Sequence, residues 1–529
     1  MARVIGRAKK PAIWSRLTSL THSTRRLRAS WSALLRRKKH RKAHMKPDFR
    51  LLNPELVNRI LDEAFHLLRE TGVKVQLPKA RQLLAEAGAE VDETAEVVKL
   101  SENLVRKAIA SVPREFFLYS RDGKPSVRYG GDSVHFDPGS SGVHFLDPDT
   151  LEHIPSQTPH LVRVLKIAES LPAYDAVSTS VVCNEVPKAI GDLYRLYLVL
   201  LYTNKPIVTG AFSAQTTQVM MDMLALYAGG REALAARPLA VFDVCPTPPL
   251  IWSKFGCQNL IDLARAGVPA EMISMPLAGA GSPVTILGSV VQHTAESLSG
   301  AVIHQLAKPG SPLVWGGAPA IFDMRQGTTP MGAVETAMID ACYAQVGKSL
   351  GFPTHTYLGA TDGKIADYQA GLESGISAMI GALAGINMIS GAGMLDFLAC
   401  ISPEKLVLDA EAIGMAKRMA RGVDALTDTL AIDLFAGIDF KADFLKKKET
   451  RSLFSKEQYL PSKVIDRGSI RAWQDAGSLD AWQRAKAETS KILAAYQRPS
   501  QPEAEKELVE MVSRLAREAG MENLPALAL

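Results

Sequence analysis

Cysteine is scarce in this sequence and irregularly placed. The 529 residues include five cysteines, at positions 183, 245, 257, 342 and 400, and no CxxC pair. An odd number of widely separated cysteines excludes a disulfide framework and offers no zinc-ligand spacing. This usage is typical of a reducing compartment, so the sequence predicts a cytoplasmic protein without a metal site.

Acidic residues are missing from residues 1–44, which hold 14 Lys and Arg. The other 485 residues carry 47 basic and 55 acidic side chains, so the formal charge of +6 comes from this leader. The basic balance therefore gives no reason to expect nucleic acid at the folded part. A leader of this kind is typical of a transit-like segment or a surface-binding arm. Met45, followed by Lys46-Pro47-Asp48, favours instead a disordered tail or a misassigned start.

Long uncharged runs are also rare, and one run, Gly375 to Leu395, reaches the length of a membrane span. Its 21 residues include five glycines, Asn387 and two serines. This composition favours an apolar helix, a turn near Ala384-Gly385 and a buried strand. We therefore expect no membrane association.

Several catalytic signatures are absent. The sequence has no HExxH motif, which lowers the rank of a zinc hydrolase mechanism. No GxGxxG or GxxxxGK[ST] opens a predicted helix, as a doubly wound nucleotide-binding sheet would require.

What the sequence does contain is a repeated strand-helix pattern, typical of βαβ units. The predicted strands are 134–146, 175–182, 206–212, 239–244, 270–275, 312–316, 353–358 and 386–390. The helices that follow them are 159–170, 188–202, 215–227, 252–266, 284–306, 334–349, 366–383 and 403–418. Eight units predict an α/β fold in the form of a closed (β/α)8 TIM barrel rather than an open sheet.

The flanks of the barrel have other patterns. Residues 45–132 predict helices followed by a hairpin with its turn at Asp122-Gly123. The barrel then occupies 133–420, and residues 421–529 predict a helical C-terminal extension. The domain prediction is thus a leader, an N-terminal helical and β extension, a barrel and C-terminal helices.

Candidate site residues cluster at predicted strand ends, where barrels of this kind hold their working residues. The strand period of two places His355 and Tyr357 on one face, and Gln369 and Glu373 share a helix face four residues apart. These four side chains can converge on one mouth. The alternative is a satisfied core histidine beside a helix whose acidic first turn complements the helix dipole.

Aromatic side chains, only 6% of the chain, recur near predicted strand ends. Together they suit a cage that holds a quaternary ammonium by cation–π attraction. Each taken singly fits core packing better than a cage. The candidates are Phe212, Phe242, Trp315 and Tyr357, with Trp252, Phe255 and Phe322 just beyond.

The loops after the strands are rich in glycine and proline, and an ordered set of motifs in this half of the chain resembles a known family. These motifs are Phe322-Asp323-Met324, Met331-Gly332-Ala333-Val334-Glu335, Asp367-Tyr368-Gln369-Ala370-Gly371, Gly391-Ala392-Gly393-Met394-Leu395 and Leu406-Val407-Leu408-Asp409. In this order they resemble the trimethylamine:corrinoid methyltransferase family, over about residues 48–470.

The resemblance implies a TIM barrel that moves a methyl group from an amine to the Co(I) of a corrinoid carried by a small separate protein. The chain has no DxHxxG, the cobalamin-ligating pattern, so the corrinoid is expected from that partner. Founding members carry pyrrolysine after the seventh strand, whereas Tyr357 to Thr361 here are ordinary residues. The chain therefore looks like the non-pyrrolysine branch, which demethylates quaternary amines such as glycine betaine. The oligomeric state stays open.

On this basis each candidate has an expected role. His355 and Glu373 are the predicted catalytic residues, with His355 binding a substrate carboxylate or positioning the nitrogen. Phe242, Trp315, Tyr357 and Gln369 are the predicted substrate-binding residues, and Gly391 and Gly393 admit the corrinoid. Two alternatives remain open: a barrel lyase acting through His355 and Glu373, and a protein that binds methylated amines without turnover.

Overall fold

The computed structural model describes residues 44–45, 47–427, 429–438, 440 and 443–527. The prediction of a disordered or misassigned leader thus lies outside the described residues, apart from its last position. The chain divides into two compact units, one of Pro47–Arg421 with Tyr459–Leu529 and one of Met1–Lys46 with Gly422–Gln458. The predicted extension at 421–529 is therefore divided between both units.

The smaller unit is built from short elements. Strand β1 (His44–Met45) pairs antiparallel with β22 (Val423–Asp424). The 3-10 helix η2 (Phe444–Lys446) lies between helices α14 (Ile432–Phe435) and α15 (Lys448–Glu457).

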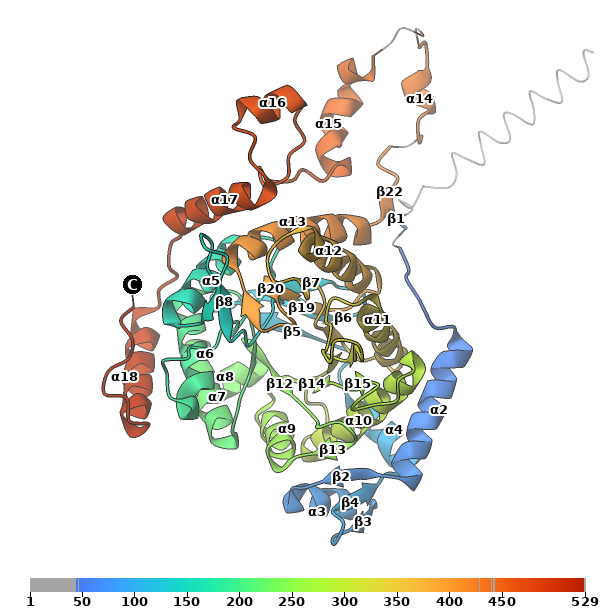
Figure 1. The fold of residues 1–529 in the computed structure, drawn as a ribbon. Coiled ribbons are helices and arrows are strands. Elements are labelled where there is room, and N and C mark those ends of the chain that lie inside the picture. Colours follow the sequence, from blue (N-terminus) through green and yellow to red (C-terminus); the bar gives the residue numbers. More distant parts are fainter. Residues whose placement is uncertain (1–43, 46, 428, 439, 441–442, 528–529) are drawn as a thin grey trace, which may run out of the picture. The chain divides into compact units, whose positions relative to one another are not determined.

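Eight parallel strands form a closed ring in the larger unit, with helices around them (Figure 1). Pairing runs without a break from β10 to β16, and a bridge from Trp315 to Thr354 joins β16 to the segment that enters β18. β18 pairs with β19, and β19 pairs with β7. The Asp175 backbone N–H donates to the Phe136 carbonyl at 2.8 Å, which brings β7 to the start of β10 and closes the ring. The strands are β7 (His135–Pro138), β10 (Val177–Ser178), β11 (Ile207–Gly210), β12 (Ala240–Val244), β14 (Ala270–Ser274), β16 (Leu313–Gly317), β18 (His355–Thr356) and β19 (Met388–Ala392).

A helix follows each barrel strand, as the repeated pattern predicts, and the TIM-barrel prediction is confirmed by this topology. The helices are α5 (Thr158–Ser170), α6 (Gly191–Tyr202), α7 (Ala214–Ala228), α9 (Lys254–Ala266), α10 (Ile286–Ala307), α11 (Val334–Ser349), α12 (Tyr368–Leu383) and α13 (Pro403–Ala420). The predicted strand 134–146 comprises both β7 and β8 (His144–Leu146), and the predicted helix 188–202 begins with the 3-10 helix η1 (Lys188–Ile190). Short elements that the sequence pattern did not predict sit between the others: α8 (Arg231–Ala236), β9 (His153–Pro155), β15 (Leu277–Ala278), β17 (Ala320–Ile321), β20 (Met394–Leu395) and β21 (Cys400–Ile401).

The N-terminal extension packs against the barrel. Asn53 caps α2 (Pro54–Glu70) by accepting the Leu56 N–H, and α2 and α4 (Glu102–Ser111) pack on α10. A small sheet joins β2 (Val73–Val75), β4 (Val97–Lys99) and β3 (Glu90–Asp92) to β13 (Ile251–Trp252), with α3 (Pro78–Glu86) beside it. At the other end of this unit, α17 (Ala481–Ala495) packs on α13 and α18 (Pro502–Glu518) on α7, after the short α16 (Ile470–Asp475).

The uncharged run from Gly375 to Leu395 is divided between α12 and β19, as expected, with a turn between them. Across the part of the chain that the structure describes, the helices are too short or too polar to span a bilayer.

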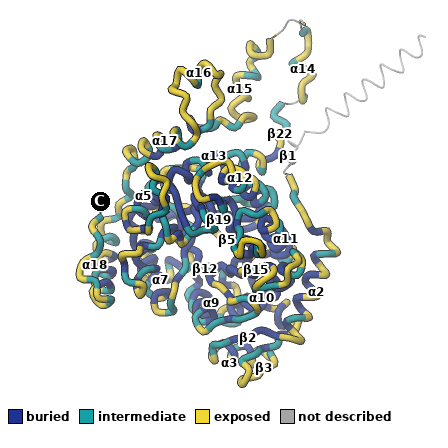
Figure 2. The backbone as a smooth tube through the Cα atoms, viewed as in Figure 1, coloured by how far each residue is buried: buried dark blue, intermediate teal, exposed yellow. Residues whose placement is uncertain are grey.

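Strand parity sorts the barrel side chains into two populations. Val208, Val241, Val314 and Met388 face the lumen, where they pack with the hairpin of β5 (Glu115–Tyr119) and β6 (Pro125–Gly130). These valines lie in the amino-terminal halves of their strands, so the hairpin fills that end of the barrel. Residues of the opposite parity join the main core between strands and helices, and the ring of strands lies in the buried centre of this unit (Figure 2).

Candidate active site

Polar side chains form one layer of the lumen above the apolar layer. Asp243 follows Val241 by two residues on β12, and Ser390 follows Met388 by two on β19, so both point inward. Above this layer Ile273, Ala320 and Met331 pack against the ring of Tyr357 in a second apolar cluster. The layer consists of Asp137, Ser140, Asp243, Glu271, His355, Tyr357 and Ser390.

One half of the layer centres on Tyr357. Its hydroxyl group donates to Asp243 Oδ2 at 2.8 Å and lies 3.0 Å from Ser140 Oγ. The Tyr357 ring meets the His355 ring edge-on, with centroids 4.9 Å apart. The period of two therefore places these two residues together, as the sequence predicts.

The other half centres on His355. Its Nε2 lies 2.9 Å from Ser390 Oγ, and Ser390 in turn donates to Asp137. His355 Nδ1 lies 3.5 Å from Glu271 Oε1. Among the described residues, no amine, amide or hydroxyl donor reaches either carboxyl oxygen of Glu271, Asp243 Oδ1 or Asp137 Oδ2, and the Glu271 and Asp243 carboxyl groups interact with each other.

Burial sets the charges of this layer. It raises the pKa of Asp137 and of Glu271 well above the ordinary carboxyl range, and neighbouring carboxylates raise both further. Burial also raises the pKa of Asp243 to about 7, although hydrogen bonds oppose it, and lowers the pKa of His355 to about 3. Burial therefore favours the uncharged forms of His355, Asp137 and Glu271, and Asp243 is the carboxyl group of this layer whose pKa lies nearest to neutral pH.

A guanidinium group lies at the edge of this layer. Arg195, on α6, donates from Nη1 to the Thr179 carbonyl at 3.0 Å and to Ser141 Oγ at 3.1 Å. Its Cζ lies 4.8 Å from the centroid of the Phe212 ring, which follows β11 and is 57% exposed. The charge of Arg195 lowers the pKa of Asp243, against the larger effect of burial. The site thus combines a fixed cation with a carboxyl group that can change its charge.

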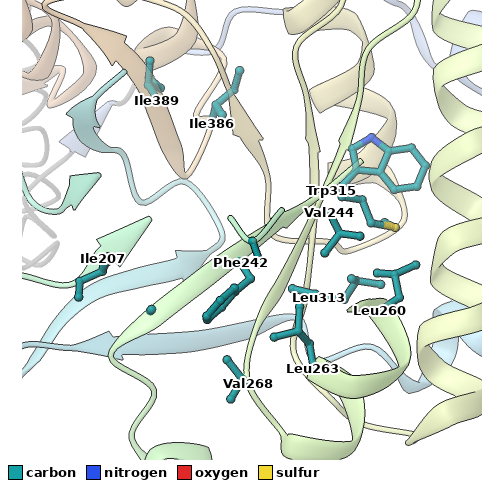
Figure 3. Close-up of a cluster of buried hydrophobic side chains, with 14 of the residues drawn as sticks. Ile207, Phe242, Val244, Leu260, Leu263, Val268, Leu313, Trp315, Ile386 and Ile389 are labelled. Atoms are coloured by element: carbon teal, nitrogen blue, oxygen red, sulfur yellow. The ribbon is translucent and has the colours of Figure 1, made fainter. Parts of the chain in front are cut away.

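Two predicted cage residues lie elsewhere. Phe242 and Trp315 have the outward parity of their strands and pack in the core between strands and helices (Figure 3). The Trp315 indole N–H donates to the Tyr343 carbonyl at 3.1 Å, and its ring packs against Phe352. The structure therefore does not place either ring where it could face N-methyl groups in the lumen. The reason is parity: each neighbours a lumen-facing position in its strand.

Gln369 and Glu373 share a helix face, as their spacing predicts, and Gln369 Nε2 donates to Glu373 Oε1 at 2.9 Å. The second oxygen of Glu373 accepts from Thr361 Oγ1 at 2.5 Å and from the Asp362 backbone N–H at 2.8 Å. These contacts fix the loop after β18. The structure gives Glu373 a place in loop support and leaves Gln369 exposed at the surface.

Gly391 and Gly393 are buried within the fold. A Cβ on Gly391 would lie 2.4 Å from the Leu358 carbonyl oxygen, so the two chains approach closely there. Gly393 has φ +80° and would place a Cβ 2.7 Å from the Leu406 side chain. Internal packing therefore explains both glycines, and the structure does not expose them to a corrinoid.

The sequence interpretation missed the lumen carboxyl groups and Arg195. A signal was present for two of them: Asp243 and Glu271 are single acids within otherwise apolar strands, where a charged residue is unexpected unless it has a function. Arg195 gave no such signal, because its position at the mouth depends on how α6 packs. No group of three or more His, Cys, Asp or Glu side chains could hold a metal ion within the described ranges.

Exposed apolar side chains surround the mouth above the layer. They belong to the loops that follow β11, β14, β16 and β18 and to the helices after these loops, and they include Phe212, Met275, Val284, Leu287, Met324, Val334, Tyr368, Leu372 and Ile376. We call this set the apolar rim. Exposed apolar side chains gathered around one opening are typical of an interaction surface.

Comparisons with known proteins identify a family and several similar chains. The profile of the family described as Trimethylamine methyltransferase (MTTB) matches residues 21–520. Trimethylamine methyltransferase MttB of Desulfitobacterium hafniense is 31% identical over 437 residues, covering 83% of this chain and 88% of the relative. Glycine betaine methyltransferase of the same species is 26% identical, covering 90% of this chain and 99% of the relative. The solved monomethylamine methyltransferase (MtmB) of Methanosarcina barkeri is 13% identical, with a TM-score of 0.47 over 88% of this chain and 93% of that one.

Proposed function

The chain belongs to the trimethylamine methyltransferase family and is a methyltransferase, and we propose that its methyl donor is a quaternary ammonium compound of the betaine type. We propose further that the methyl acceptor is the Co(I) of a corrinoid carried by a separate protein. The observation that carries the proposal is the carboxyl-lined lumen beneath an apolar rim.

The lumen suits a cationic head group. An ionised Asp243 attracts a positive nitrogen, and the Tyr357 ring beside it offers an aromatic face to a quaternary ammonium. Asp137 and Glu271 stay protonated, so a single negative charge meets the cation. A site with one negative charge favours a substrate whose head group carries one positive charge over a head group that carries two.

Chemistry favours a quaternary donor at this site. When the C–N bond of a quaternary ammonium breaks, its electron pair stays on nitrogen and a neutral tertiary amine leaves, so no proton donor is required. His355, uncharged and hydrogen-bonded to Ser390, is poorly placed to supply one. The residues of the layer then act by positioning the head group and excluding water.

A carboxylate on the substrate would find a cation at the mouth. Arg195 is a buried guanidinium, 1% exposed, whose charge interacts with both Asp243 and Tyr357. His355 could bind a carboxylate only through a neutral N–H, without a positive charge, because burial lowers the pKa of His355 to about 3. We therefore assign carboxylate binding to Arg195, which supports a zwitterionic substrate such as glycine betaine.

The apolar rim fits a methyl acceptor presented by a partner protein. A corrinoid is a broad, flat group, and it would supply a strongly nucleophilic Co(I). Phe212, Met275 and Tyr368 are among the exposed side chains that could contact it or its carrier. The ordinary residues from Tyr357 to Thr361 support a donor that needs no pyrrolysine.

The test is methyl transfer by the full chain to Co(I) cobalamin, followed by the change from Co(I) to methyl-Co(III) absorbance. The donors are glycine betaine, tetramethylammonium, choline and trimethylamine, each with and without a corrinoid protein. Transfer from a quaternary donor and none from trimethylamine supports the proposal. Transfer from trimethylamine alone, or from none of the donors, contradicts it.

A further inference from the structure

Several buried polar atoms of the lumen lack partners among the described residues. Within the described part of the chain, no amine, amide or hydroxyl donor reaches either carboxyl oxygen of the fully buried Glu271, Asp243 Oδ1 or Asp137 Oδ2, and the Glu271 and Asp243 carboxyl groups interact with each other at these positions. Buried polar groups are nearly always hydrogen-bonded, because leaving them unpaired costs free energy. Unpaired acids at the mouth of an enzyme barrel indicate that a ligand completes the layer.

We propose that Asp243 is the residue that recognises the substrate's cationic nitrogen, and that binding of this cation expels one proton from the Asp243 carboxyl group. The inference rests on the proposed function, because it takes a quaternary ammonium as the ligand. It assigns a specificity-determining residue and a proton that leaves on binding.

Position selects Asp243 among the three acids. Asp137 and Glu271 are fully buried, and Asp137 already accepts from Ser390. Asp243 is partly exposed at the carboxyl end of β12, two residues before the exposed Cys245. Tyr357 holds Asp243 Oδ2 at 2.8 Å, and Oδ1 is a buried atom beside the Glu271 carboxyl group. A cation entering from the mouth therefore meets Asp243 first.

Of the titratable groups around this position, Asp243 is the one whose charge can change when a cation binds. They are Glu271 on β14, Asp137 on β7, Tyr129 on β6, Tyr357 and His355 from the β18 segment, Cys245 on its own loop and Arg195 on α6. Burial keeps the acids, the tyrosines and His355 uncharged at neutral pH. Arg195 is cationic but not sufficient to keep Asp243 ionised, since the Asp243 pKa is raised to about 7.

The sign of the linkage follows. A permanent cation beside Asp243 favours the carboxylate, so the pKa of Asp243 is lower in the complex than in the free protein. Below pH 7 binding must release a proton, and affinity falls about tenfold for each unit of decreasing pH. Well above pH 7 the carboxyl group is already ionised, and affinity no longer depends on pH.

The experiment is isothermal titration of the full chain, without corrinoid, in buffer pairs of different ionisation enthalpy. The probes are tetramethylammonium, glycine betaine and 3,3-dimethylbutanoate, which has the shape of betaine with carbon in place of nitrogen. Both cations are expected to release close to one proton at pH 6 and almost none at pH 8.5. The neutral-headed 3,3-dimethylbutanoate is expected to release none at either pH.

Variants complete the design. Asp243→Asn is expected to bind both cations at least about tenfold more weakly, with no proton release. Asp222→Asn, which changes an exposed carboxylate of α7 that pairs with Arg231, is expected to match the wild type. Should Asp243→Asn fail to fold, the pH dependence of wild-type affinity decides the matter alone.

The proposal is overturned if neither cation binds, if affinity for both is independent of pH between 5.5 and 8.5, or if Asp243→Asn still releases a proton. These outcomes are separable from failure of the proposed function. Proton-linked binding without methyl transfer would overturn only the function, and methyl transfer without proton release would overturn only this inference.

Discussion

The Tyr357 hydroxyl group reaches across the barrel lumen to Asp243 and donates to its Oδ2 at 2.8 Å. The two residues belong to the β18 segment and to β12, and β14 and β16 lie between these strands in the ring. The bond therefore spans the mouth rather than joining neighbouring strands. It fixes the orientation of the carboxyl group that we assign to substrate recognition.

Replacing Tyr357 with Phe removes this bond together with the contact to Ser140. Because a hydrogen bond to the carboxylate favours ionisation, its loss raises the pKa of Asp243. We expect kcat/KM for the quaternary donor to fall about 10- to 100-fold and the acidic limb of its pH profile to move to higher pH. Tyr459→Phe, which removes a hydroxyl bonded to Glu411 away from the lumen, should leave the profile in place. An unshifted profile in Tyr357→Phe would contradict the role of this bond.

Stability should depend on pH through Asp243. Its pKa is raised from the ordinary value near 4 to about 7 in the folded state. A raised carboxyl pKa favours the folded state below the unfolded pKa, and this contribution is lost as pH rises through about 7. Asp243→Asn has no charge to bury, so we expect its melting temperature to exceed that of the wild type by on the order of 2 °C at pH 8 and to gain less at pH 5. A gain at pH 5 equal to that at pH 8, measured by calorimetry, would contradict the assignment.

Trp315 provides a test of strand parity. Its indole packs between β16 and α11 and bonds to the Tyr343 carbonyl. We expect Trp315→Phe to lower the free energy of unfolding by about 1–3 kcal/mol, measured by denaturant titration, while the Kd for tetramethylammonium stays within about twofold of the wild-type value. If Trp315→Phe lost affinity for tetramethylammonium and kept its stability, Trp315 would contact the substrate instead of the core.

Two glycines of the same region should respond in opposite directions. Gly391→Ala forces a methyl group against the Leu358 carbonyl, and we expect it to destabilise the protein by about 1–3 kcal/mol. Gly371 lies in α12 with open space for at least 4 Å around the position that an added methyl group would take, so Gly371→Ala should stabilise by about 0.5–1 kcal/mol. Equal effects in denaturant titration would show that Gly391 is not a packing residue.

The sequence predicted the barrel because each unit repeats locally. The period of two in each strand and the helical pattern after it are properties of adjacent residues, so all eight units could be located within a few residues. His355 and Tyr357 were found in the same way, since both lie within one strand segment.

The rest of the site was not predictable in that manner. Asp243 and Glu271 lie on different strands, and only the closed ring shows that both reach the same layer as His355. Aromatic content drew attention to Phe242 and Trp315, although strand parity, applied to Val241 and Asp243, already turns Phe242 outward. Arg195 reaches the mouth from a helix, so its position depends on tertiary packing.

The most direct measurement of the central claim is an isotopic competition in one reaction. The full chain, Co(I) corrinoid protein, glycine betaine bearing three CD3 groups and an equal concentration of unlabelled trimethylamine are allowed a single turnover. Mass spectrometry then determines whether the methyl group on cobalt is CD3 or CH3. The account predicts almost entirely CD3 from the quaternary donor. A predominance of CH3 would show that the donor is the tertiary amine and would contradict the account.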